Sequence, residues 1–213
     1  QRRKALGITD PDDPRLAFKY FTPEKSRASF HFNPFENFAP EVHSDIQLCQ
    51  LLLESLALQH GEGYGRSYYS RRARFHLLEV LKSSPQPRTL ADLHDKLRNL
   101  LRPRERHEAF ELVATVHALA HYPSLATGPA ADPATTIHMP TLLEHSQCAY
   151  FWLPAAVESV SVKEISKLAI FAMVSAAIDR QRSGAQTRQS YMIIDEFQRL
   201  AGGPFEGEVV EPV

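Results

Sequence analysis

The hydrophobic pattern of the chain predicts a helical middle part between two parts with strand-like runs. Ser44 precedes a stripe of apolar residues that recur at helical spacing as far as Ala57. Three further helices are expected at about 67–81, 90–101 and 105–121. Thr89 is a capping residue for the third helix of the series, and prolines break the connectors. Four consecutive helices with short connections indicate a compact all-helical subdomain.

The last third of the chain has a different pattern. Residues Cys148–Leu153 form an unbroken apolar run closed by Pro154, after a single helical turn at 140–145. A helix with an apolar middle is expected over Ser161–Arg182, and a second apolar run follows at Tyr191–Ile194. Strand, helix and strand in this order predict a right-handed crossover in a parallel sheet whose strands are covered on both faces.

The first residues carry little periodic signal. Residues 1–29 are polar and are expected to be rich in loops, while Phe30–Phe32 alternates like a short strand that Asn33 and Pro34 end. The prediction is an α/β fold whose partial parallel sheet is interrupted by the all-helical subdomain. We expect a first sheet segment at 1–40, the helical subdomain at 41–125 and a second sheet segment at 126–213.

The composition of the chain limits the possible classes of protein but does not indicate a binding partner. With 43% hydrophobic residues and a net charge of −1, the 213-residue chain can bury a core, and its total charge calls for neither nucleic acid nor membrane. Cys49 and Cys148 fit no metal spacing and are interpreted as small buried apolar residues. The longest apolar run, 168–178, is too short for the roughly 20 residues of a membrane span and is expected to be buried against the sheet. The chain starts without Met, and we expect it to be a piece of a longer protein.

The pair Asp195 and Glu196 carries the clearest chemistry. It ends the second apolar run, and ligands of open α/β sheets bind at the carboxyl ends of parallel strands. In P-loop ATPases an Asp at this position (the Walker B strand) holds Mg²⁺, and a neighbouring acid can polarise the attacking water. Asp195 would then orient hydrated Mg²⁺, and Glu196 would be the general base. The alternative is a solvated pair, since a strand must end in a polar turn.

The residues around this pair carry a resemblance. The run from Asp195 to Leu200, with the strand at 152–154 and the helix at 161–181 before it, resembles the coupling proteins of type IV secretion and the conjugative DNA-transfer ATPases. Relatives of these proteins include septal DNA translocases. Upstream, residues 29–35 and 65–81 resemble the segments that lead into and open their helical subdomain. The likeness covers most of residues 25–200, and its one sharply defined motif is the carboxylate strand.

The resemblance implies a partial RecA-like sheet, with ATP and Mg²⁺ as cofactors. It further implies a DNA or nucleoprotein substrate, other secretion-system proteins as partners, a homohexameric ring, and a place in the bacterial cytoplasm at the inner membrane. One departure is clear, because none of the nine glycines precedes a lysine as the phosphate-binding loop of an ATPase requires. If the intact protein is a P-loop ATPase, the loop precedes Gln1, and this piece alone is expected neither to bind ATP tightly nor to hydrolyse it.

A second hypothesis is a non-catalytic helical module, about Val42–Tyr122, that binds a secretion substrate, a relaxosome protein or DNA. Between Glu62 and Arg106 there are 11 Lys or Arg residues against 5 Asp or Glu residues. The candidate nucleic-acid contacts are Arg66, Arg71, Arg72 and Arg74, with Tyr68 and Tyr69 placed to stack on bases. The alternative is the solvated face of a helix.

A histidine pair and a glycine-rich run are explained by structure more simply than by a binding site. His117 and His121 are four residues apart and would share a helix face as zinc ligands do, but no third ligand with matching spacing accompanies them. The run Gly61–Gly65 follows no strand, so it is interpreted as a hinge and not as part of a dinucleotide-binding loop.

Overall fold

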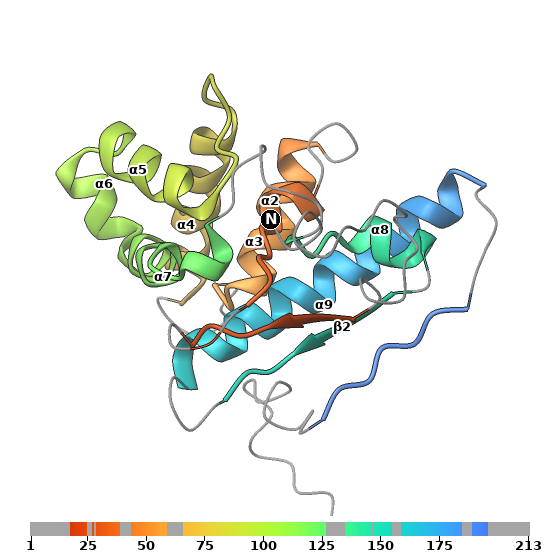
Figure 1. Ribbon diagram of the computed structural model, residues 1–213. Helices are drawn as coiled ribbons and strands as arrows, with labels where there is room; N and C mark the ends of the chain where they lie inside the picture. The colour runs from red at the N-terminus through yellow and green to blue at the C-terminus, as the bar shows by residue number, and fades with distance from the viewer. Residues whose placement is uncertain are drawn as a thin grey trace, which may run out of the picture.

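A computed structural model of the chain describes residues 18–24, 27, 29–38, 44–58, 66–126, 135–145, 147–154, 159–184 and 189–195. Within these residues the chain is mostly helical, with one small parallel sheet (Figure 1). The predicted hinge at Gly61–Gly65 lies outside the described residues.

The described elements follow one another in a simple order. The strands are β1 (Phe18–Phe21) and β2 (Cys148–Phe151). The helices between them are α2 (Pro34–Asn37), α3 (Asp45–Ser55), α4 (Arg66–Leu81), α5 (Leu90–Leu100), α6 (Pro103–Glu108), α7 (Phe110–Ala120), the 3-10 turn η2 (Pro123–Leu125) and α8 (Met139–Glu144). After β2 comes the long helix α9 (Ser159–Arg182).

Local capping chemistry starts α3 and α5 where the sequence predicts. The hydroxyl of Ser44 accepts a hydrogen bond from the backbone N–H of Gln47, whose side chain accepts one from the N–H of Ser44. Thr89 in the same way accepts from the N–H of Asp92 at 3.0 Å. The predicted helix at 105–121 is two helices, because Ala109 (φ −106°, ψ 26°) leaves the helical conformation between α6 and α7.

The two strands are parallel, and the α2–α8 segment connects them. Phe18 pairs with Cys148 and Phe21 with Phe151. The prediction of a loop over 1–29 is therefore wrong at β1, because the strand is defined by a partner far away in the sequence and not by its own pattern. The predicted strand at Phe30–Phe32 is reduced to a single bridge between His31 and Thr136.

The sheet has one covered and one exposed face. On the covered face Phe21 and Phe151 pack with ring centroids 5.0 Å apart. On the other face Tyr150 is 49% exposed and Cys148 is exposed as well. The predictions that both faces are covered and that Cys148 is buried are therefore wrong, since no described element packs over that face. Cys49 is buried as predicted, and burial raises the pKa of its thiol to about 11.

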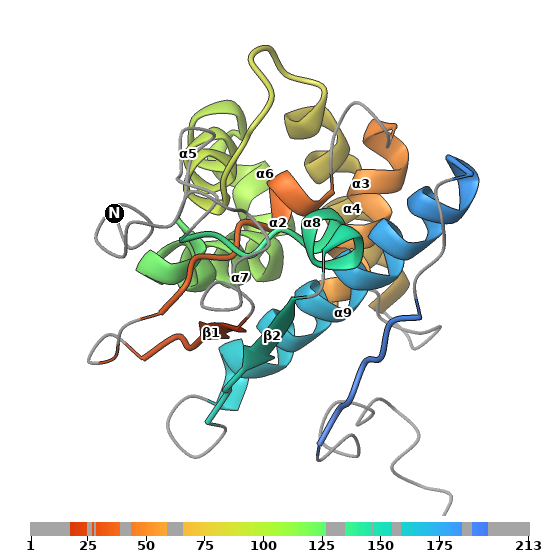
Figure 2. The same ribbon diagram turned by 45° about the vertical axis from the view of Figure 1, so that its right-hand side comes forward.

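Helix α9 lies along the sheet, with the other helices on its far side (Figure 2). It packs mainly on α8, α3 and α2 and contacts α7 as well. Leu168 and Ala172 of its apolar stretch are buried, while Val174 and Ile178 remain exposed. Only one face of the 168–178 run is thus covered, and mostly by helices. No described helix is both long enough and apolar enough to cross a membrane.

Buried polar groups join the helical part to the sheet. The amide of Asn37 donates to the carbonyl of Asn33 at 2.9 Å and to that of Ile137 at 3.3 Å, and its oxygen accepts from the N–H of Met139 at 2.6 Å. The ammonium of Lys19, on β1, donates to the carbonyl of Thr136 at 2.7 Å, and burial lowers the pKa of Lys19. These bonds fix the segment before α8 against α2 and β1.

Candidate functional site

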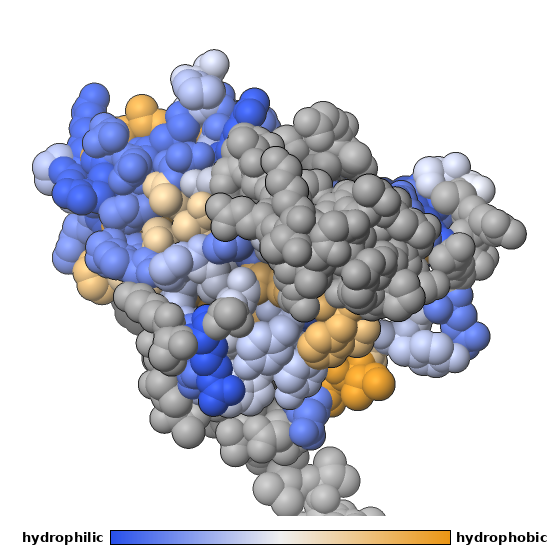
Figure 3. Space-filling view, in the orientation of Figure 1, coloured by the Kyte–Doolittle hydropathy of each residue, from blue (hydrophilic) through white to orange (hydrophobic). Residues whose placement is uncertain are grey.

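The segment that carries the predicted catalytic pair is not a strand in the structure. Tyr191–Ile194 forms no ladder with another described segment, Tyr191 is 75% exposed and Ile193 is 92% exposed. Figures 1 and 2 both show residues 189–195 running apart from β2. In Figure 3 the strongest hydrophobic colour on the visible face lies low on the right, where this segment passes. The strand prediction is wrong here because an extended segment becomes a strand only by pairing with a neighbour.

The two carboxylates can be placed only in part. Asp195 lies in an exposed turn after this segment, and Glu196 lies outside the described residues. An exposed turn away from the β1–β2 pair does not by itself favour Mg²⁺ binding over a solvated carboxylate. The catalytic roles of Asp195 and Glu196 therefore stay predictions.

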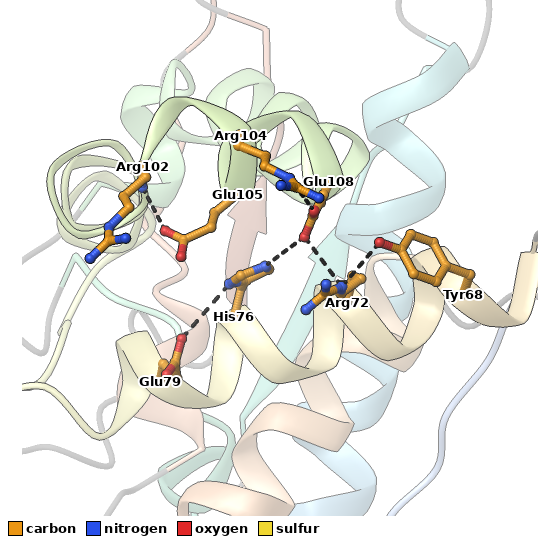
Figure 4. Close-up of polar contacts among 8 residues, drawn as sticks. All are labelled: Tyr68, Arg72, His76, Glu79, Arg102, Arg104, Glu105 and Glu108. Carbon is orange, nitrogen blue, oxygen red and sulfur yellow. Dashed lines mark hydrogen bonds and ion pairs between the residues drawn. The ribbon is translucent and has the colours of Figure 1, made fainter.

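The predicted arginine patch is divided by an ion-pair network between α4 and α6 (Figure 4). The Nε atom of Arg72 lies 3.2 Å from Oε2 of Glu108 and donates a hydrogen bond to the hydroxyl of Tyr68. Arg104 binds the other oxygen of Glu108 at 3.4 Å. Arg72 is thus directed towards a carboxylate of the same chain.

The other members of the patch are placed differently. Arg71 and Arg74 are exposed on α4, and the side chain of Arg66 is outside the described residues. Arg72 is thus engaged within the chain while Arg71 and Arg74 are exposed, and a nucleic-acid contact by the four arginines stays a prediction.

A buried histidine lies beside this network. His76 is only 2% exposed, and its Nε2 and Nδ1 atoms lie 3.9 Å from Glu108 and 3.8 Å from Glu79. Within the described part of the chain neither ring nitrogen has a hydrogen-bond partner. Sequence reasoning missed His76, because Glu108 reaches it only through the packing of α6 against α4.

A groove between α5, α6 and α7 collects basic and aromatic side chains. Its volume is about 450 Å³, and its described lining consists of His94, Arg98, Arg106, His107, Phe110, Val113, Ala114 and His117. No Asp or Glu is among these residues, and the ring of Phe110 is 66% exposed. Neither arginine forms an ion pair with another described residue, and Nε of Arg106 is buried without a hydrogen-bond partner. We call this feature the α5–α7 groove.

Histidines meet at one end of the α5–α7 groove. His117 of α7 and His121, the residue that caps its C-terminal end, lie side by side as the sequence predicts, with ring centroids 4.4 Å apart. His94 of α5 joins them, with its Nε2 atom 3.0 Å from Nδ1 of His117. Burial lowers the pKa of His94, and the neighbouring His117 lowers it further. The sequence did not reveal His94 as a neighbour, because it is placed by helix packing and not by spacing.

The side chains around the α5–α7 groove suit a binding surface better than a closed metal centre. Among the described residues, no set of three or more His, Cys, Asp or Glu side chains is placed to hold a metal ion. The α5–α7 groove instead combines positive charge with an apolar floor, as partner-binding grooves do. Comparison of the chain with known protein families, with curated proteins and with solved structures gives no match.

Proposed function

We propose that the chain is part of an ATP-driven motor that moves DNA or nucleoprotein and resembles the coupling proteins of type IV secretion. The observation that supports this best is the topology, in which parallel strands β1 and β2 flank a helical insertion and α9 then leads to Asp195. This order is expected of an α/β nucleotide-binding core interrupted by a helical subdomain.

In this proposal residues 191–194 form the next strand of a RecA-like sheet in the assembled motor. The exposure of Tyr191 and Ile193 supports the idea, since pairing would remove about 25 cal/mol of unfavourable free energy per Å² of apolar surface buried. Asp195 would then orient hydrated Mg²⁺ at the strand end, and Glu196 would activate water. ATP would be held by a phosphate loop that precedes Gln1, and six copies would surround the cargo at the inner membrane.

The test uses the chain together with the sequence that precedes it in its gene. Glu196→Gln should lower ATP turnover by about a hundredfold or more while nucleotide binding persists, because only the general base is removed. Asp195→Asn should weaken Mg²⁺ dependence as well as turnover. Glu144→Gln, an exposed position on α8, is the matched control. Unchanged turnover in Glu196→Gln would exclude the catalytic role.

A second candidate function is a helical binding module, and the α5–α7 groove favours it. Arg98, Arg106 and three histidines surround an apolar floor that includes Phe110. This chemistry fits a partner that carries negative charge beside an apolar or aromatic group. A secretion substrate, a relaxosome protein and single-stranded DNA can each offer that combination.

Charge reversal separates the groove from the arginine patch. Arg98→Glu with Arg106→Glu should weaken binding of a labelled acidic peptide or single-stranded DNA by about tenfold or more, with a reduced salt dependence. Arg71→Glu with Arg74→Glu tests the predicted arginine patch on α4 in parallel. Fluorescence anisotropy across a salt series is the measurement. Equal losses in both double variants would show unspecific charge attraction, and no loss in the groove variant would exclude the groove.

A further inference from the structure

The ring nitrogens of His94 and His117 face each other across two helices. The Nε2 atom of His94 lies 3.0 Å from the Nδ1 atom of His117, and the ring centroids are 4.7 Å apart. His94 comes from α5 and His117 from α7, so the pair connects two helices that pack directly on each other. Both side chains line the α5–α7 groove and can be reached from solvent.

The spacing suits a shared metal ion as well as a hydrogen bond. Two nitrogens bound at about 2.0–2.1 Å, with an angle near 90–110° at the metal, lie about 3.0–3.4 Å apart. The rings are also inclined by 42° and are not stacked. Two imidazole nitrogens in this arrangement can reach one ion with only small side-chain shifts.

Hydrogen-bonding groups nearby orient the rings of His94 and His121, the two histidines beside His117. Nδ1 of His94 lies 3.5 Å from a carboxylate oxygen of Asp95, which leaves Nε2 as the coordinating atom. In metal sites, a carboxylate on the far nitrogen holds an imidazole in the ligating tautomer. The Nδ1 atom of His121 is bound to the backbone carbonyl of His117 at 2.7 Å, so its own Nε2 atom stays available beside the pair.

We propose that His94 and His117 form a two-histidine site for a borderline divalent transition metal such as Zn²⁺, Ni²⁺ or Cu²⁺. Imidazole nitrogens favour these ions over Mg²⁺ or Ca²⁺. Water from the open α5–α7 groove completes the coordination, since only two protein ligands are in place. The positive charges of Arg98 and Arg106 oppose the ion, so the site binds less tightly than a closed structural zinc site. The site shares the α5–α7 groove with the second candidate function, but the inference does not require either proposed function to be correct.

Zn²⁺, and then Ni²⁺ and Cu²⁺, are titrated into the tag-free chain, and binding is measured by calorimetry. The midpoint temperature of thermal unfolding is measured with and without each ion. One equivalent should bind, and the midpoint should rise, because the ion joins α5 to α7 in the folded state only. His94→Gln and His117→Gln should each weaken binding by at least about tenfold and remove the rise. His145→Gln, near the end of α8, should change neither quantity.

Two further measurements keep the inference falsifiable if a variant loses stability. Each variant's midpoint shift is compared with its own metal-free midpoint, so a folding defect does not count as lost binding. Long-range NMR of the imidazole nitrogens should show Zn²⁺ on Nε2 of His94 and on Nδ1 of His117. The inference fails if both variants bind zinc as tightly as the wild type, or if zinc does not raise the unfolding midpoint of the wild type. The two rings would then only be hydrogen-bonded to each other.

Discussion

Two regions of similar apolar content differ sharply in burial. Leu93 and Leu97 of α5 are fully buried, as are Leu112 and Val116 of α7 against which α5 packs. The segment 189–195 is also rich in apolar residues, yet most of its surface is exposed. The two regions differ in their neighbours, since α5 and α7 pack against each other within the chain, while no described strand pairs with 191–194. A strand-like run is therefore stabilised only when a sheet edge reaches it.

The largest effect is expected when a large apolar side chain is shortened in each of the two regions. Leu97→Ala should lower the free energy of unfolding by about 2–5 kcal/mol, because it leaves a cavity in a well-packed helix pair. Ile193→Ala should change it by less than about 0.5 kcal/mol, because the side chain is 92% exposed. Urea unfolding of both variants is the measurement. If the two losses were equal, the segment would be packed in solution and the comparison would fail.

The second test concerns the joint between the helical part and the sheet side. Asn37→Ala should cost about 2–3 kcal/mol, since it removes three buried hydrogen bonds to the backbone of Asn33, Ile137 and Met139. Asn99→Ala, on the exposed face of α5, is the matched control and should have little effect. The measurement is again urea unfolding. A loss in Asn37→Ala no larger than in the control would show that water replaces these bonds.

The same contrast explains which features could be predicted from the sequence. The caps at Ser44 and Thr89 are local, because each side chain binds an N–H three residues ahead, and so the starts of α3 and α5 are predicted correctly. β1 was missed because its partner, β2, lies far along the chain. The sheet was predicted to be parallel, and it is, but between β1 and β2 and not between β2 and 191–194.

The candidate sites follow the same rule. The helical spacing of His117 and His121 was visible in the sequence, but their contact with His94 depends on how α5 packs on α7. Arg72 was placed with the nucleic-acid candidates because of the local charge. Its engagement with Glu108 required the position of α6. Spacing thus reveals neighbours within a helix, and packing decides the rest.

A third test asks how much of the helical region's stability comes from a local signal. Thr89→Ala should lower the free energy of unfolding by about 1 kcal/mol, because the N–H of Asp92 loses its acceptor at the start of α5. Thr89→Ser should remain close to the wild type, since it keeps the hydroxyl. Chemical unfolding of the two variants is compared in parallel. Similar losses would mean that the methyl group, and not the cap, is responsible.

The smallest expected effect is at Glu164, a buried residue of α9. One oxygen of its carboxylate is buried without a hydrogen-bond partner among the described residues, and burial raises the pKa of the group, with Lys167 and Lys163 opposing the shift. A raised folded-state pKa means that the ionised form is disfavoured in the folded chain. The resulting penalty is present at pH 7 and is lost as the pH falls through the folded-state value towards the ordinary value of 4.5.

Glu164→Gln should therefore stabilise the chain slightly at pH 7 and have no such effect near pH 4, where the wild-type carboxyl is already neutral. The gain should be below about 1 kcal/mol, because a backbone hydrogen bond and the two lysines offset part of the cost of burying the charge. Unfolding of wild type and variant at both pH values gives the answer, and Glu144→Gln on α8 is the exposed control. A stabilisation that persisted unchanged at pH 4 would assign the effect to packing. A destabilisation at pH 7 would show that the Glu164 carboxylate is paired in solution.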